Sequence, residues 1–371
     1  METIPVANVV TTEEDARAVY DVVKSGWISK GKKVDAFEAD FAKAVGAQSA
    51  AAVSSGTAAL HVILAALGVG PGDEVVLPSL TFISTANAVL YLGATPVLVE
   101  CDPDTYNVTP EILEAAITPR TRALVPVDMN GLPVDYDAVL ELGRRHGVAV
   151  VSDSAESLGA TYKGRAIGGV SPLHLFSFFP NKTVTTGEGG MITAADPALM
   201  ARMRVLLNQG QEGRYNHVAL GFNYRMSDIA AALGIVQLTR LDWMIAEKNR
   251  IAAAYRELLA GIPGLSLPVV PDYVTQPSWY MFAVQVDETV RDGVVAYLKE
   301  RGIDTRLSFP PIHIQAYYRE RFGYAPEDLP VSWHTWRRLI NLPVWPGITR
   351  EQLARVAETL AGALAAVRPG V

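Results

Sequence analysis

Short apolar segments that alternate with helical segments constrain the fold of this chain more than any other feature of its sequence. Most of these segments are followed by a turn and then by a helical pattern. Buried strands that are joined through helices pair in parallel, so the alternation predicts an α/β fold, with a mainly parallel sheet and helices on both faces. The predicted strands are residues 50–53, 74–77, 96–99, 124–127, 148–152, 173–178 and 190–193.

Helix signals accompany these strands. Thr11-Thr-Glu-Glu14 is typical of a capped helix start, and we expect that helix to run to about residue 24. Other helices are predicted at residues 34–45, from the turn after residue 53 to about residue 67, at residues 85–92 and at residues 136–146.

The alternation of strands and helices ends near residue 240. A long helix is predicted at residues 241–262, strands at residues 280–286 and 306–309, and a closing helix at residues 350–364. We therefore expect a large domain over residues 1–245 and a smaller C-terminal α+β domain over residues 246–371.

Charge and cysteine content limit the partners of this chain. A formal net charge of −7 argues against nucleic acid or an anionic membrane as the main partner. The single cysteine, Cys101, excludes an intrachain disulfide and fits a reducing cytoplasm. The first residues lack a basic segment followed by an apolar run, so no signal peptide is predicted. The most apolar stretch, residues 50–70, contains Ser54 and His61, and we interpret it as a strand, turn and helix rather than a membrane span.

Ser54-Ser-Gly-Thr57 lies between a predicted strand and a predicted helix. Helix N-termini offer free backbone N–H groups and a partial positive charge, which suit a phosphate. Gly56 allows the backbone to approach such a ligand closely. The alternative is that the Ser and Thr side chains only cap the helix.

Asp153 stands where a buried strand is predicted to end, and Glu156 follows one turn later. A carboxylate at the carboxyl end of a strand is well placed to pair with a cation in a ligand site. The alternative for both residues is a helix cap or a turn.

Lys182 lies in Ser177-Phe-Phe-Pro-Asn-Lys-Thr-Val-Thr-Thr-Gly-Glu-Gly-Gly190, between an apolar run and a glycine-rich turn. A lone lysine is usually a solvated side chain. Here a phosphate-suited turn, a strand-end carboxylate and this lysine follow one another along an α/β sheet, which is what pyridoxal 5'-phosphate (PLP) needs. The lysine forms a Schiff base with the aldehyde, and the carboxylate keeps the ring nitrogen protonated. We expect PLP as the cofactor and no metal.

Five sequence segments carry a resemblance to a known family: Ser25-Gly-Trp-Ile-Ser29, Pro78-Ser-Leu-Thr-Phe-Ile-Ser-Thr-Ala-Asn87, Asp102-Pro-Asp-Thr-Tyr-Asn107, Gly221-Phe-Asn-Tyr-Arg-Met226 and Leu342-Pro-Val-Trp-Pro-Gly-Ile348. Over nearly its whole length the chain resembles the DegT/DnrJ/EryC1/StrS sugar aminotransferases, which have the aspartate-aminotransferase fold. The resemblance implies a fold type I enzyme with a seven-stranded, mainly parallel sheet.

The resemblance also implies roles for individual residues. Lys182 would be the Schiff-base lysine, which serves as both acid and base, and Asp153 the partner of the pyridine nitrogen. We expect burial to lower the pKa of Lys182 toward working pH. Phe82 would stack on the ring. The phosphate would be held by Gly56, Thr57 and Ser177, and Ser55 is a further candidate for cofactor binding.

Two further roles depend on the same resemblance. Asn223 would reach the phosphate of the neighbouring subunit's cofactor, so the active unit would be at least a homodimer. Glu156 stands where many members carry Gln, and it would approach the ring hydroxyl or the substrate. Dimer and tetramer both stay open.

Within the family, the segment around Lys182 and Asn208-Gln-Gly-Gln211 are similar to perosamine-synthase-like enzymes. That similarity implies glutamate as amino donor and a GDP-linked 4-keto-6-deoxyhexose as acceptor, giving a 4-amino-4,6-dideoxy sugar. Arg306 and His313 are candidate substrate contacts, with a surface ion pair and a turn as their structural alternatives. Antigen polysaccharide and antibiotic glycosylation are both open as pathways.

Other functions stay open at this point. The acceptor could be C3 of a dTDP-sugar, or C4 of a UDP- or dTDP-sugar. A PLP dehydratase is disfavoured because those enzymes typically carry His at the position of Lys182. A non-catalytic PLP-binding regulator is disfavoured because nothing in the chain resembles a DNA-binding domain. One departure bears on the sugar: many members read His-Leu-Tyr-Gly where this chain has Asp128-Met-Asn-Gly131, a position expected near the cofactor or sugar.

Overall fold

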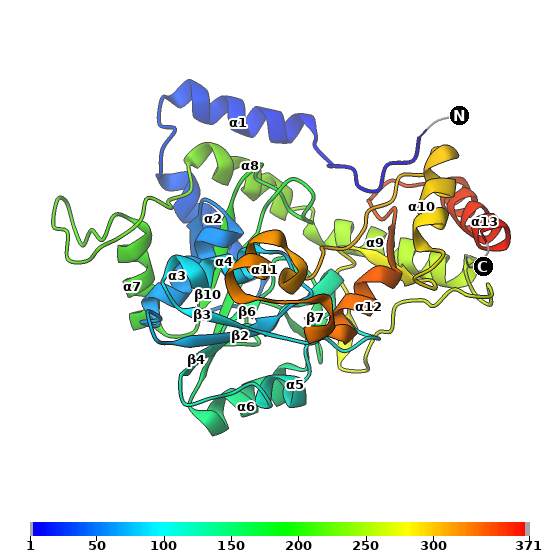
Figure 1. The fold of residues 1–371 in the computed structure, drawn as a ribbon. Helices are drawn as coiled ribbons and strands as arrows, with labels where there is room; N and C mark the ends of the chain where they lie inside the picture. Colours follow the sequence, from blue (N-terminus) through cyan, green and yellow to red (C-terminus); the bar gives the residue numbers. More distant parts are fainter. Residues whose placement is uncertain (1–2, 368–371) are drawn as a thin grey trace.

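The computed structural model describes residues 3–367 and has a seven-stranded sheet at its centre (Figure 1). The strands form two hydrogen-bonded groups, which a parallel bridge between Val127 and Asp153 joins into one sheet. In spatial order they are β3 (Thr95–Val99), β2 (Glu74–Pro78), β4 (Thr121–Leu124), the broken strand β5 (Ala149–Val150) and β6 (Ser152–Asp153), β9 (Leu173–Ser177), β10 (Gly190–Ala194) and β1 (Ser49–Val53). Only β10 pairs antiparallel with its neighbours in this sheet. The predicted mainly parallel, seven-stranded α/β fold is therefore confirmed.

Helices cover both faces of this sheet because alternate strand residues point to opposite faces. In β1, Ala51 and Val53 belong to a core cluster that contains α3 (Gly56–Ala66), α4 (Ser84–Tyr91) and α7 (Pro197–Leu207). The alternate residues Ala50 and Ala52 belong to a second cluster. That cluster contains α2 (Lys32–Ala44), α6 (Tyr136–His146) and part of α8 (Asp228–Leu238).

A smaller unit packs beside the sheet, at the right of Figure 1. Its antiparallel strands β12 (Phe282–Gln285) and β13 (Leu339–Leu342) share a core with α9 (Leu241–Leu258), α10 (Arg291–Glu300) and α13 (Arg350–Ala366). Ile4 joins this core, and its N–H donates to Gly302 O at 2.8 Å. The domain boundary at residue 245 stays a prediction.

The remaining elements lie outside the sheet and the β12–β13 pair. Thr12 caps α1 (Glu13–Ser25), as predicted from Thr11-Thr-Glu-Glu14. The others are α5 (Pro110–Glu114), β7 (Thr161–Tyr162), β8 (Arg165–Ala166), β11 (Val274–Gln276), α11 (Ala316–Phe322), α12 (Pro330–Arg338), and the 3₁₀ turns η1 (Met129–Gly131), η2 (Ile312–Ile314) and η3 (Pro326–Asp328).

Three predicted elements differ from the structure. The strand predicted at residues 306–309 is wrong: Arg306 makes a single bridge to Asn341, and prolines follow at 310 and 311, which lack the N–H that a strand needs. Strand β4 ends at residue 124, before Pro126. Helix α9 ends at residue 258, and Gly261 then adopts a left-handed φ of 73°.

Among residues 3–367, no single helix is long and apolar enough to cross a membrane. The bent pair α8 and α9 meets the length and composition test only when the two helices are combined across a 58° bend.

Four phenylalanines, Phe37, Phe41, Phe176 and Phe178, fix α2 against the sheet. The Phe41 ring meets those of Phe176 and Phe178 edge-on, with centroids 5.0 and 5.6 Å apart. We predict that Phe41→Ala lowers the free energy of unfolding by about 3–5 kcal/mol, because the fully buried ring leaves a cavity. Urea denaturation measures this. Val23→Ala on the exposed face of α1 should change it by less than about 0.5 kcal/mol, and equal losses in both variants would contradict the packing argument.

Candidate active site

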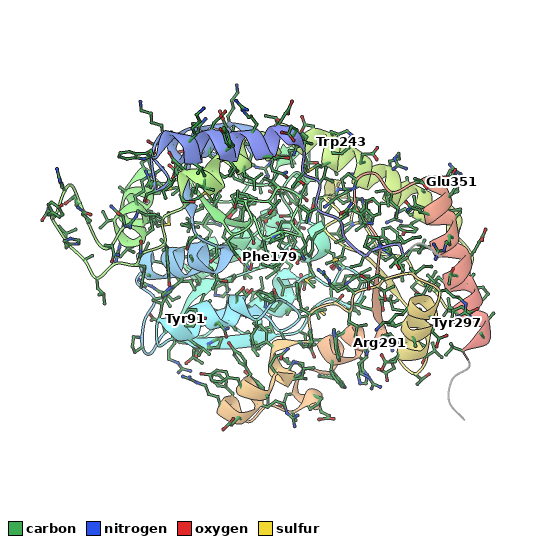
Figure 2. The ribbon with its side chains drawn as sticks, turned by 90° about the horizontal axis from the view of Figure 1, so that it is seen from above. Tyr91, Phe179, Trp243, Arg291, Tyr297 and Glu351 are labelled. Carbon is green, nitrogen blue, oxygen red and sulfur yellow. The ribbon has the colours of Figure 1, made fainter. Side chains whose placement is uncertain are left out.

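A cavity of about 290 Å³ opens at the carboxyl ends of the strands. Asp153 ends β6, Ser177 ends β9, and Ser55 follows β1, so the strands themselves bring these residues together. Phe179, just beyond β9, lines the same cavity and lies near the middle of the molecule (Figure 2). The residues predicted from the sequence that line the cavity are Ser55, Gly56, Thr57, Phe82, Asp153, Glu156, Ser177 and Lys182.

The N-terminus of α3 forms one wall of this cavity. Ser55 is its N-cap, and its Oγ accepts a hydrogen bond from the Ala58 N–H at 3.1 Å. The capping alternative therefore holds for Ser55, and the positive end of the helix still faces the cavity. The backbone is tightly packed here: a Cβ on Gly56 would lie 3.0 Å from the Cβ of Ser177. The chain can take this path only because residue 56 has no side chain.

Asp153 is buried at the base of the cavity. Its Oδ2 accepts from the Thr85 hydroxyl at 3.1 Å, and its Oδ1 accepts from the Ala155 N–H at 3.2 Å. Burial raises the pKa of Asp153, while the Ala155 N–H, the Lys182 charge and the Thr85 hydroxyl oppose that shift. These partners orient a carboxylate toward any cationic group that enters the site.

Lys182 lies among groups that favour its charged form. Its Nζ is 3.5 Å from Glu156 Oε1 and 3.9 Å from the centroid of the Tyr280 ring. Burial acts to lower the pKa of Lys182, but Tyr280, Glu156 and Asp153 outweigh it, and the pKa is raised. The expected lowering is therefore wrong for this chain, because the fold places Tyr280 and two carboxylates beside the amine.

Glu156 is held in turn by the segment that departs from the family pattern. Its Oε2 accepts from the Asn130 N–H at 2.8 Å. Burial raises the pKa of Glu156, and the charge of Lys182 and this N–H oppose the shift. Asp128 does not line the cavity. It is fully enclosed and accepts from the Tyr136 hydroxyl at 2.7 Å and the Ser157 hydroxyl at 2.6 Å. None of residues 128–131 lines this cavity, and the departure shapes the loop that orients Glu156.

Three predicted residues lie outside the lining of this cavity. Asn223 is exposed and forms a backbone bridge to Asn208. Arg306 is partly exposed, and its charge acts on Tyr280 at the cavity edge. His313 is buried, with its Nδ1 2.7 Å from Ser79 Oγ and its Nε2 3.3 Å from Pro326 O. Its ring nitrogens thus have partners within the fold. The ligand contacts proposed for these three residues stay predictions.

Sequence reasoning missed Tyr280, Asn181 and Phe309, which also line the cavity. Asn181 stands next to Lys182 in the quoted motif, so its position was a usable signal. Tyr280 and Phe309 come from segments far along the chain, at residues 280–286 and 306–309, where the sequence predicted strands and gave no signal for these two residues as part of a site. Phe309 packs against Phe82 with ring centroids 5.1 Å apart.

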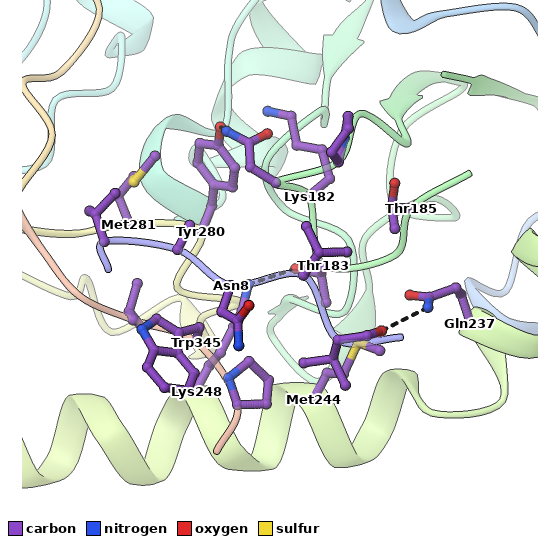
Figure 3. A pocket seen from close by; sticks show the side chains of 18 residues that line it. Asn8, Lys182, Thr183, Thr185, Gln237, Met244, Lys248, Tyr280, Met281 and Trp345 are labelled. Carbon is purple, nitrogen blue, oxygen red and sulfur yellow. Dashed lines mark hydrogen bonds between the residues drawn. The ribbon is translucent and has the colours of Figure 1, made fainter. Parts of the chain in front are cut away.

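A second buried lysine lies behind Lys182. Lys248 of α9 is 4% exposed, and its Nζ donates to Thr183 Oγ1 at 3.0 Å (Figure 3). Among residues 3–367, no carboxylate forms an ion pair with it. Burial, together with the nearby Lys182 charge, lowers the pKa of Lys248 to about 8.

PLP fits this cavity on three observations. The Gly56 backbone packs so closely that a Cβ would fill the cradle at the start of α3, where a phosphate would sit. Asp153 offers a buried carboxylate for a pyridinium nitrogen, and Lys182 offers an amine in the same cavity. The fold and these groups define the class: the protein is a PLP-dependent enzyme of fold type I.

Comparison with known proteins gives the family. The chain belongs to the DegT/DnrJ/EryC1/StrS aminotransferase family, whose profile matches residues 10–361. The spore coat polysaccharide biosynthesis protein SpsC of Bacillus subtilis is 40% identical over 365 residues, which are 94% of each chain. The GDP-perosamine synthase of Caulobacter vibrioides is 42% identical over 348 residues, covering 92% of this chain and 93% of the synthase.

Solved structures agree with this assignment. DesV of S. venezuelae is 38% identical, with a TM-score of 0.95 over 99% of this chain and 100% of DesV. The PLP form of Spr1654 from Streptococcus pneumoniae is 28% identical, with a TM-score of 0.92 over 97% of this chain and 98% of that one. The protein is thus a PLP-dependent aminotransferase.

The backbone packing around α3 predicts a cofactor defect. A Cβ on Gly190 would lie 2.6 Å from the carbonyl of Ser55 and 2.8 Å from the N of Gly56. We expect Gly190→Ala to displace this turn and to weaken PLP binding roughly tenfold, as measured by absorbance titration. Gly70→Ala is the matched control, because a Cβ there meets nothing within 4 Å. Unchanged PLP affinity in Gly190→Ala would contradict the proposed cradle.

The unpaired charge of Lys248 predicts a pH-dependent stability difference. Its folded pKa of about 8 lies below the ordinary 10.5, so the unfolded chain holds this proton more tightly between those values. The wild type therefore loses stability as pH falls from 10.5 to 8. We expect Lys248→Met to have a free energy of unfolding about 2 kcal/mol above that of the wild type at pH 7, after the lost Thr183 hydrogen bond is subtracted. This gain in stability should disappear near pH 10.5. Urea denaturation at both pH values measures the difference in stability between the variant and the wild type. The same difference at both pH values would contradict the proposed cost of burying the Lys248 charge.

Proposed function

We propose that this aminotransferase moves an amino group from glutamate to the keto group of a nucleotide-linked 4-keto-6-deoxyhexose, giving a 4-amino-4,6-dideoxy sugar. The observation that carries the amino-transfer part is the Lys182 amine beside the Glu156 and Asp153 carboxylates in one cavity. Support for the GDP-linked acceptor comes from the 42% identity to GDP-perosamine synthase.

The residues that line the cavity have separate roles in this reaction. Bound PLP supplies an electron sink that makes the carbon bearing the transferred nitrogen acidic. Nζ of Lys182 would take that proton and return it to the carbon on the other side of the same nitrogen. Asp153 holds a proton at the pyridine nitrogen, and the start of α3 with Ser177 holds the phosphate.

The charge state of Lys182 sets the pH dependence of this step. The amine accepts a proton only when neutral, and Tyr280 together with the Glu156 and Asp153 carboxylates raises its pKa. Removal of the proton therefore becomes faster as pH rises through that pKa. The Glu156 carboxylate receives the ammonium that results, at the 3.5 Å separation seen here.

The active unit we propose is a homodimer with shared sites. Asn223 is exposed and follows the projecting segment 209–221, at the left of Figure 1. Within that segment, Tyr215 is 78% and Leu220 91% exposed. Exposed apolar side chains on a projecting segment favour contact with a second copy, which would bring Asn223 to the neighbouring cofactor phosphate.

Two further assignments belong to this proposal. We place the enzyme in the cytoplasm, which suits its single, buried and unpaired Cys101. The name of SpsC favours a polysaccharide rather than an antibiotic pathway.

Product analysis tests the proposal directly. The protein is incubated with PLP, glutamate and GDP-, dTDP- and UDP-linked keto-deoxysugars, and the masses of the products are measured by mass spectrometry. We expect exchange of a carbonyl oxygen for an amino group on the GDP-linked 4-keto sugar. Lys182→Ala should abolish it while the protein stays folded, whereas Lys299→Ala on exposed α10 should not. Amination of a dTDP- or UDP-linked sugar alone would correct the acceptor, and normal turnover by Lys182→Ala would overturn the mechanism.

A further inference from the structure

Tyr280 is the aromatic residue that covers the amine of Lys182. Its side chain is nearly buried, and its ring centroid lies 3.9 Å from Lys182 Nζ (Figure 3). The ring borders both the main cavity and the smaller one behind Lys182 that Lys248 lines. An ammonium over an aromatic face is attracted by the ring quadrupole, and more strongly where water is excluded.

Several contacts lock this ring in place. Its hydroxyl accepts a hydrogen bond from Asn181 Nδ2 at 2.9 Å, so the residue that precedes Lys182 also orients the ring. Two residues before Tyr280, the N–H of Ser278 donates to Gly131 O at 3.0 Å and its hydroxyl donates to Glu156 O at 2.8 Å. The segment that carries Tyr280 is therefore tied to the loop that carries Glu156.

The backbone before Tyr280 is strained. Trp279 has a left-handed φ of 49°, an outlier for so bulky a residue. Its indole Nε1 donates to Asn249 Oδ1 at 3.0 Å, and Asn249 Nδ2 donates to Pro277 O at 3.0 Å. Strain of this kind persists only where the surroundings determine the conformation, and it gathers at functional sites.

We propose that the face of Tyr280, together with the Glu156 carboxylate, is the docking position of the free Lys182 ammonium. Tyr280 is then a positioning residue that acts through Lys182. This inference rests on the proposed proton-carrying role of Lys182. When the amine is not covalently held and carries a proton, the ring and the carboxylate keep it beside the reacting carbon, because both favour the ammonium over the neutral amine.

The charged groups around Lys182 set the equilibrium between its ammonium and its neutral amine. Asp153 and Glu156, from the end of β6 and the loop after it, favour the ammonium, and Lys248 from α9 opposes it. Arg306 acts on Tyr280 from the neighbouring segment. Tyr280 contributes through its ring face, which lies over the amine, and through its hydroxyl, which also raises the pKa of Lys182. Removing the whole ring should therefore shift the Lys182 titration more than removing the hydroxyl alone.

The test measures the titration of Lys182 in the cofactor-free protein. Acetic anhydride labels neutral amines, and mass spectrometry follows the Lys182 peptide as a function of pH. We expect the labelling midpoint of Tyr280→Leu to fall by about one pH unit, which is roughly tenfold more neutral amine below the midpoint. The midpoint of Tyr280→Phe should fall by less, because this variant keeps the ring face. The exposed Lys299 serves as an internal control in each sample.

Two results would overturn the proposal: an unchanged midpoint in Tyr280→Leu, or equal shifts in the Leu and Phe variants, which would assign the effect to the hydroxyl. If Tyr280→Leu does not fold by circular dichroism, Tyr280→Met repeats the test with a longer apolar side chain. The labelling needs no turnover. A midpoint shift without sugar amination would therefore contradict the proposed acceptor and still support the docking position.

Discussion

The structure depends on the compensation of one buried charge, the ammonium of Lys182. A buried cation is stable only when opposite charge, hydrogen bonds or an aromatic face replace the lost water. Here Asp153 and Glu156 do so from one segment of the chain and Tyr280 from another, distant in sequence. Lys248 shows the contrast: it is more deeply buried than Lys182 but lacks an acidic partner among residues 3–367, and its pKa falls to about 8.

The parallel sheet makes this compensation possible. Parallel strands all end at one edge, so Asp153 and Ser177 meet there although they are far apart in sequence. The N-terminus of α3 reaches the same edge because Gly56 and Gly190 allow backbones to touch without a Cβ between them. The smaller unit then supplies Tyr280 through a strained segment anchored on the Glu156 loop. The cavity is thus a product of both parts of the chain.

Much of this arrangement could be predicted from the sequence, and the exceptions have physical causes. The sheet strands and the residues at their ends follow from local apolar runs and turns, and residues 55–57, 153, 156, 177 and 182 all line one cavity. Tyr280 could not be predicted, because its place is set by tertiary hydrogen bonds of Ser278 and Trp279 rather than by a local pattern. The direction of the Lys182 pKa was wrong for the same reason, since it depends on charges brought in by the fold.

The covalent attachment site of the cofactor tests the central claim most directly. The PLP-loaded protein would be reduced with borohydride, digested, and analysed by mass spectrometry to locate the modified lysine. The account predicts the modification on Lys182, which lies in the cavity with Asp153 and the start of α3. Modification of Lys248, the other buried lysine beside that loop, would contradict it.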